Sequence, residues 1–246
     1  MDKTVPWTSM DLIHAILLMI ASMGLIIGLL SFVTLQDMAF GLDEVKSHDS
    51  FMPTTFIVLN GLILLIVWYF TLRKYNSCLA VLGLRNPVLP QSYIKFGMPQ
   101  SFLTLIGLPA LVLLVSILFM ALYTLVVASA GWEVFEPSIV DDKLIGYGNI
   151  RLANIIIIGL WGPFAEELFF RGFLLPGLVN KLGKLVGILI VSLLFALAHL
   201  SLASFLPIFV IGILLASLYL LTRSIWPGLV VHSFQNSIVI LMSFTY

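Results

Sequence analysis

Long apolar stretches recur along the whole chain, separated by short segments that carry most of the charged residues. A helix needs about 20 apolar residues to cross the hydrocarbon core of a membrane. The expected fold is therefore all-α, a polytopic bundle of membrane-spanning helices. Seven spans are predicted, over residues 12–35, 54–73, 108–130, 152–176, 185–203, 205–222 and 226–244.

One stretch leaves the number of spans open between seven and eight. Residues 91–130 are too many for one helix and too few for two good ones. Pro99 and Pro109 are expected to break this run, because proline cannot donate a helical hydrogen bond. Residues 91–107 are then predicted to lie along the membrane surface, or to form an eighth span.

Composition and charge agree with a multi-pass membrane protein. Hydrophobic residues make up 61% of the chain and charged residues 10%, with a mean hydropathy of +1.13. Soluble domains contain about 25% charged residues. Lys and Arg concentrate in the segments on the side of the N-terminus, so the positive-inside rule predicts a cytoplasmic N-terminus. Short loops without an appended domain are typical of a prokaryotic plasma-membrane protein.

The same features limit the partners and the organisation of the chain. The single cysteine, Cys78, excludes an intrachain disulfide. Basic residues are spread over several loops, which argues against a nucleic-acid partner and leaves the lipid bilayer as the expected surroundings. Residues 1–150 form N-terminal transmembrane helices with no recognised signature. Residues 151–246 hold the intramembrane polar groups, and oligomeric state stays open.

The segment FAEELFFRGF places three charges inside an otherwise apolar helix. Glu167 and Arg171 are four residues apart, with the glutamate first, which is the favourable order for a helical ion pair. Glu166 lies about 100° away around the helix, and the sequence gives it no obvious local partner. Charged groups at membrane depth are rare and mark functional sites. An ion pair alone is more often a structural staple, so Glu166 is the residue that needs a function.

Two further clusters share the four-residue spacing: Phe195 with His199, and His232 with Asn236. Taken singly, each histidine could serve packing, Asn236 could join helices, and Phe195 could fill the core. Their joint occurrence with Glu166 within about 70 residues favours a site. The chain's other membrane polar groups, among them His14 and Asn60, are interpreted as structural.

This set of groups suits hydrolysis by water. A desolvated Glu166 could act as a general base towards a water molecule that an imidazole orients. An imidazole N–H and the Asn236 amide could stabilise the oxyanion formed when an amide carbonyl is attacked. Only Ser201 and Ser233 lie close in sequence to the deep histidines, and neither suggests a nucleophile–base pair. Water is the favoured nucleophile.

The three motifs, EExxxR, FxxxH and HxxxN in this order, resemble those of the CPBP family of CAAX proteases and bacteriocin-processing enzymes, also called the Abi family. The resemblance covers about residues 150–240. It implies an intramembrane endopeptidase in which Glu166 activates water, His199 helps to hold it, and His232 with Asn236 stabilises the oxyanion. Glu167 and Arg171 would form a supporting ion pair and Phe195 would line the site.

The sequence leaves alternatives open for the use of a metal, for the substrate and for the class of function. No cofactor is required on the favoured interpretation, although Glu166, His199 and His232 could instead bind zinc. The substrate would be a membrane-associated peptide or protein, prenylated or not. A transporter or proton-relay protein, or a non-enzymatic immunity or interaction protein, would also keep buried Glu and His residues. Counting residues from the charged helix ends places His199 about 10 Å further outward than Glu166 and His232.

Overall fold

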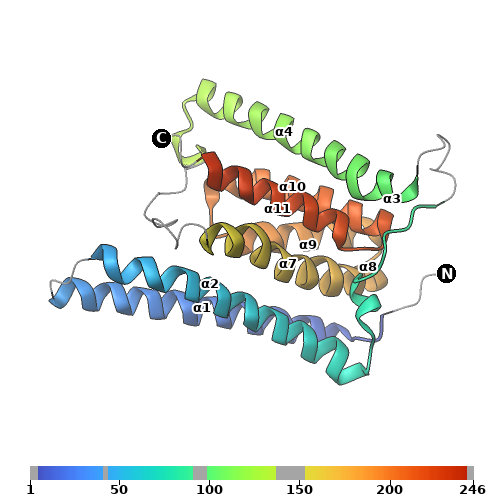
Figure 1. Cartoon of the computed structure of the whole chain (residues 1–246), viewed down its shortest axis with the longest axis horizontal. Helices are drawn as coiled ribbons and strands as arrows, with labels where there is room; N and C mark the ends of the chain where they lie inside the picture. Colours follow the sequence, from blue (N-terminus) through green and yellow to red (C-terminus); the bar gives the residue numbers. More distant parts are fainter. Residues whose placement is uncertain (1–4, 41–43, 91–98, 137–152, 243–246) are drawn as a thin grey trace. The chain divides into compact units, whose positions relative to one another are not determined.

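The computed structural model describes residues 5–40, 44–90, 99–136 and 153–242 (Figure 1). None of these residues forms a β-strand, and the predicted all-α fold is confirmed. Five described helical runs are long and apolar enough to cross a membrane: Ser9–Val33, Thr54–Arg73, Gln100–Ala130, Ala153–Leu182 and Leu202–Thr222. The remaining two predicted spans form shorter helices, α9 (Lys184–Ala198) and α11 (Trp226–Met242).

The predicted span over residues 185–203 is too long. Helix α9 ends at Ala198, and α10 (Leu202–Thr222) begins three residues after His199. Ser201 is the N-cap of α10, and its hydroxyl accepts a hydrogen bond from the Ser204 N–H at 3.2 Å. The apolar run therefore contains a turn that hydropathy alone does not reveal.

Three prolines follow π-helical turns. Pro109 follows η4 (Leu103–Gly107), Pro163 follows η6 (Ile157–Trp161), and Pro176 follows η7 (Glu167–Leu174). Proline lacks an N–H, and its ring clashes with the carbonyl four residues earlier. A π-turn transfers the hydrogen bonding to the fifth residue back. Because the π-turns are wider than α-helical turns, each proline lies within a helical run that continues past it.

The expected break at Pro109 is accordingly wrong. Short α3 (Gln100–Phe102), η4 and α4 (Leu108–Ala130) join into the single run Gln100–Ala130, which starts directly after Pro99. Residues 100–107 are thus part of this helix rather than a separate surface segment. The rest of the predicted surface segment, residues 91–98, lies outside the described residues.

The chain divides into two compact units, each built from separated segments. Unit 1 comprises Met1–Pro6, Ser77–Ser138 and Glu167–His232, and unit 2 comprises Trp7–Asn76, Ile139–Glu166 and Ser233–Tyr246. One boundary falls between the adjacent glutamates. Another divides α11 directly after His232, so each unit receives part of the predicted site.

In unit 1, α10 packs against both α9 and α4, and α8 (Leu175–Leu182) packs against α9. Leu215 and Leu218 of α10 meet Val231 of α11 in a buried apolar core. Short 3₁₀ turns η2 (Leu79–Leu82) and η5 (Glu133–Phe135) complete this unit. The start of α11 is held by the loop after η2, because the Ile225 N–H donates to the Gly83 carbonyl at 3.1 Å.

In unit 2, α1 (Ser9–Phe40) packs along α2 (Glu44–Val67), which continues as the π-turn η1 (Trp68–Arg73) (Figure 1). Thr8 and Asp11 form a capping box at the start of α1, with the Thr8 N–H donating to Asp11 at 2.8 Å. The buried Asp11 carboxylate also accepts hydrogen bonds from Lys74 and Tyr75 after η1. This cluster ties the ends of the two helices together.

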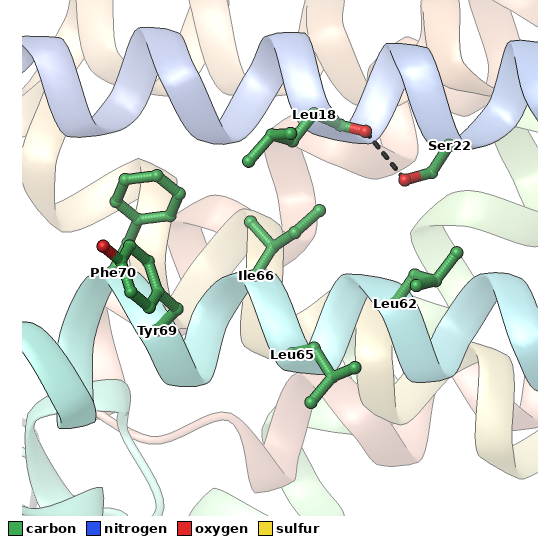
Figure 2. A pocket seen from close by; sticks show the side chains of 7 residues that line it. All are labelled: Leu18, Ser22, Leu62, Leu65, Ile66, Tyr69 and Phe70. Carbon is green, nitrogen blue, oxygen red and sulfur yellow. Dashed lines mark hydrogen bonds between the residues drawn. The ribbon is translucent and has the colours of Figure 1, made fainter.

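An apolar pocket of about 240 Å³ lies between α1 and the α2–η1 segment. Figure 2 shows its lining side chains, which are Leu18, Ser22, Leu62, Leu65, Ile66, Tyr69 and Phe70. The Ser22 hydroxyl donates to the carbonyl of Leu18 at 2.8 Å, within its own helix. The lining of this pocket holds no carboxylate, imidazole or amine.

Candidate active site

The ion pair predicted from the four-residue spacing is present in unit 1. A guanidinium nitrogen of Arg171 lies 2.9 Å from Oε1 of Glu167, and both side chains are 1% exposed. An isolated charge in such a position is strongly unfavourable, whereas a paired and hydrogen-bonded charge is tolerated. Each residue therefore makes the burial of the other possible.

Glu167 has a second partner that the sequence did not reveal. Nδ1 of His232, on α11, lies 3.1 Å from the same oxygen, Oε1, that accepts from Arg171. His232 is 4% exposed and Glu167 is fully buried. The carboxylate thus bridges a guanidinium and an imidazole that come from different helices. Glu167 is a positioning group for His232 as well as the counter-ion of Arg171.

Gly228 makes this close approach possible. A Cβ atom at Gly228 would lie 2.9 Å from Oε2 of Glu167, closer than a side-chain carbon can approach. Gly228 precedes His232 by one helical turn on the same helix, so the glycine and the histidine present one face to the carboxylate. A glycine in an apolar helix gives no local signal of such a contact.

The Phe195 ring lies at the centre of the polar groups of unit 1. Its centroid is 4.7 Å from the ring centroid of His199 and 5.5 Å from that of His232, both in edge-to-face geometry. The Arg171 guanidinium lies 4.1 Å from the Phe195 centroid, within cation–π range. Phe195 therefore spaces the two imidazoles, a role more specific than filling the core.

His199 stands at the end of α9, directly after its last helical residue. Its Nδ1 is 2.8 Å from the carbonyl oxygen of Phe195, and the side chain is exposed. Both histidines thus contact the same phenylalanine ring. The predicted helix boundary is wrong, since α9 ends at Ala198 inside the apolar run that contains it, and the depth of His199 in the membrane stays a prediction.

These hydrogen bonds determine which ring nitrogen carries a proton. A carbonyl oxygen only accepts, so Nδ1 of His199 is the donor to Phe195 and its Nε2 is an acceptor in the neutral ring. An ionised Glu167 likewise requires a proton on Nδ1 of His232. In the neutral ring, Nε2 of His232 is then an acceptor, and it donates only when the ring is an imidazolium.

In unit 2, Glu166 ends the short helix α7 (Gly162–Glu166) and is half-buried. Asn236, on the C-terminal part of α11, donates from Nδ2 to the carbonyl oxygen of Ile158 at 3.0 Å. Ile158 lies five residues before Pro163, the spacing at which a π-helical N–H would bond this carbonyl. Pro163 has no N–H, so it cannot donate to the Ile158 carbonyl. The side-chain amide of Asn236 donates to that carbonyl instead.

The structure thus assembles Glu167, Arg171, Phe195, His199 and His232 within unit 1, and places Glu166 and Asn236 in unit 2. Within the described residues of either unit, no group of three or more His, Cys, Asp and Glu side chains is placed to hold a metal ion. The alternative zinc set takes Glu166 from unit 2 and both histidines from unit 1, so it stays a prediction.

Comparison with known proteins confirms the resemblance found in the motifs. Residues 148–238 match the family described as type II CAAX prenyl endopeptidase Rce1-like, a range that contains all three motifs. A Bacillus subtilis (strain 168) protein described as "Putative membrane peptidase YdiL" is 27% identical over 173 residues, covering 69% of each chain. No solved structure matches the chain. The relationship supports a membrane-embedded protease.

Proposed function

We infer that this Rce1-like membrane protein is an intramembrane endopeptidase of the CAAX type, which cleaves a peptide bond of a membrane-associated substrate with water activated by Glu166. The observation that carries this inference is the cluster around Phe195. It brings His199 of α9 and His232 of α11 to one ring, next to the Glu167–Arg171 pair. The family match over residues 148–238 supports the same reaction class.

In the proposed reaction, Glu166 takes one proton from a water molecule while the water oxygen attacks the scissile carbonyl carbon. Nε2 of His199 accepts a hydrogen bond from the same water and fixes its orientation. The protonated Glu166 then donates its proton to the leaving amine as the C–N bond breaks. A carboxyl group can serve both steps, because it accepts a proton when ionised and donates one when protonated.

The developing oxyanion would receive hydrogen bonds from His232 and Asn236. The contact of Nδ1 with Glu167 adds a condition, because Nε2 of His232 donates only when the ring is an imidazolium. Glu167 is thus proposed to fix the orientation of the His232 ring towards the oxyanion. Asn236 uses one N–H for the Ile158 carbonyl, and the second N–H of the amide remains for the oxyanion.

Zinc is the alternative means of activating the water. Each histidine donates a hydrogen bond from Nδ1 to an oxygen. Nε2 is therefore the nitrogen that would bind a metal. A zinc ion held by these nitrogens and Glu166 would act as a Lewis acid towards the water. The favoured proposal needs no metal, and chelation separates the two.

The test is cleavage by purified protein in liposomes, with a farnesylated CAAX peptide and the same peptide without the prenyl group. Glu166→Ala and His199→Ala are expected to abolish cleavage, whereas Glu133→Ala, at an exposed carboxylate in η5, should cleave like wild type. Loss of cleavage on chelation, restored by zinc, would replace the glutamate–water mechanism. Full activity of Glu166→Ala would refute the proposal.

The proposed orientation, with a cytoplasmic N-terminus, has a test in the single cysteine. Cys78 is exposed and follows the second span, so the proposed orientation would put it on the cytoplasmic side. A membrane-impermeant maleimide should label it only after permeabilisation of intact cells. Labelling of Cys78 in intact cells would show the opposite orientation.

A further inference from the structure

Two loops of unit 1 are hydrogen-bonded to each other at the start of α11. The first loop follows η2 and carries Arg85, and the second connects α10 to α11 and carries Arg223. Nε of Arg85 donates to the carbonyl oxygen of Arg223 at 2.6 Å. The Ser224 hydroxyl donates to the carbonyl oxygen of Arg85, also at 2.6 Å. These bonds hold together two arginines that are far apart in the sequence.

Tyr219 of α10 brings a phenol hydroxyl to the same loops. The residue is only 4% exposed. The tip of its ring lies at Gly83, where a Cβ atom would be 3.2 Å from the hydroxyl oxygen. The positive charges of Arg85 and Arg223 both act on this hydroxyl. A buried tyrosine hydroxyl usually has a hydrogen-bond partner, but none of the residues that the structure describes supplies one here.

The backbone of Arg223 gives a reason to look for a function of its side chain. Arg223 is the C-cap of α10 and has a φ of 56°, in the left-handed region. Glycine is the usual residue at such a helix end, because a Cβ atom is strained there. A cation benefits from the helix dipole anywhere in the last turn, so this benefit does not require the strained position. Strain of this kind is typical of functional sites.

The side chains that meet here can donate hydrogen bonds to an anion. A guanidinium has five N–H donors and no acceptor, and a phenol hydroxyl has one donor. The Nε of Arg85 is used within the protein, and its two terminal nitrogens remain for a ligand. No carboxylate of the described part of the chain forms an ion pair with Arg85. Arginines in such a pair are suited to a carboxylate or a phosphate.

The same helix connects this set of donors to the candidate active site. Helix α11 begins at Trp226, and His232 follows six residues later, about 9 Å along the helix axis. An extended peptide covers about 3.3 Å per residue, so this length corresponds to about three residues. An anion bound at the arginines would therefore lie about three residues from a peptide bond held at His232.

We propose that Arg85, Arg223 and Tyr219 bind the C-terminal carboxylate of the peptide substrate, about three residues beyond the bond that is cleaved. This inference rests on the proposed function, because it requires a peptide bond to be cleaved near His232. Arg85 lies outside residues 148–238, so the family match does not assign it a role. A phospholipid phosphate would satisfy the same donors, but the distance to His232 favours the peptide.

The test compares two farnesylated CAAX peptides, one with a free C-terminal carboxylate and one with a C-terminal carboxamide. Wild type in liposomes is expected to cleave the acid with a kcat/KM about tenfold above that of the amide. Arg85→Gln and Arg223→Gly should bring this ratio close to one, chiefly by raising KM for the acid. Glycine suits the backbone of position 223, so Arg223→Gly should keep the wild-type thermal stability. Lys184→Gln, at the exposed first residue of α9, is the control and should keep the wild-type ratio.

Equal cleavage of both peptides by wild type, or a ratio unchanged in both arginine variants, would overturn the inference and leave the proposed function intact. An equal loss of activity towards both peptides would show a structural role. If that loss appears only in liposomes that contain phosphatidylglycerol, it would show a lipid headgroup site; either result would overturn the inference. Should Arg85→Gln fail to fold, Arg223→Gly decides.

Glu166→Ala, run in the same assay, separates this inference from the proposed mechanism. If Glu166→Ala still cleaves and still prefers the acid, the role of Glu166 is refuted and the carboxylate site stands. If wild type cleaves neither peptide, the proposed function is refuted and the inference falls with it.

Discussion

Replacing Gly228 by alanine tests whether Glu167 must hold His232. The new methyl carbon would start 2.9 Å from Oε2 of Glu167, about 0.5 Å inside a normal contact distance. The carboxylate is rigid, so Oε1 moves when Oε2 moves. Its hydrogen bond to His232 is already 3.1 Å long and would stretch beyond hydrogen-bonding range.

The expected magnitude follows from the bond that is lost. A hydrogen bond to a charged group contributes about 1.5–3 kcal/mol. Alanine regains about 1 kcal/mol over glycine in a helix. The net loss of stability is therefore expected to be about 0.5–2 kcal/mol. The misplaced imidazole is expected to lower kcat by about 100-fold, since displacements near 1 Å have effects of this size.

The assay is peptide cleavage in liposomes, with unfolding followed in parallel for each variant. Gly24→Ala serves as the control, because a Cβ at Gly24 of α1 meets no atom within 4 Å. This control should match wild type in activity. A Gly228→Ala protein that loses stability but keeps its kcat would show that Glu167 is only the counter-ion of Arg171, and would refute the positioning role.

Three further perturbations have defined outcomes. Arg171→Met leaves the Glu167 charge buried without its counter-ion and should cost about 3–5 kcal/mol of stability in an unfolding titration; a loss under 1 kcal/mol would contradict the burial argument. Pro163→Ala restores an N–H that competes for the carbonyl now bound by Asn236, so kcat should fall at constant KM, and an unchanged kcat would argue against this link. The hydrogen bond to Asp11 raises the pKa of Lys74 above its usual 10.5, so its stabilising contribution is complete below about pH 10 and is lost as the pH rises through the raised pKa. Melting temperatures of wild type and Asp11→Asn should converge at alkaline pH, and a constant difference would contradict this assignment.

The membrane class and the short-range pairs were predictable from the sequence. Hydropathy is a local property, and a run of apolar residues predicts a helix in lipid whatever its neighbours are. The Glu167–Arg171 pair follows from helix geometry alone, because residues four apart share a face. The proximity of Phe195 and His199 follows in the same way.

Helix boundaries needed the structure. The π-turn before Pro109 keeps the helix continuous where the sequence predicted a break. The turn after Ala198 lies inside an apolar run and places His199 after the end of α9 rather than within a span. Both features depend on how backbone hydrogen bonds are redistributed, which residue identity alone does not specify.

Only tertiary packing decided which polar groups meet. Glu167 and His232 are separated by 65 residues, and their contact depends on a glycine on α11 that has no signature of its own. Phe195 comes to contact both imidazoles because α9 packs against η7 and α11 meets Glu167 of η7 through Gly228 and His232. A helix specifies its own face, but the face that it meets is determined by the free energy of packing the whole bundle.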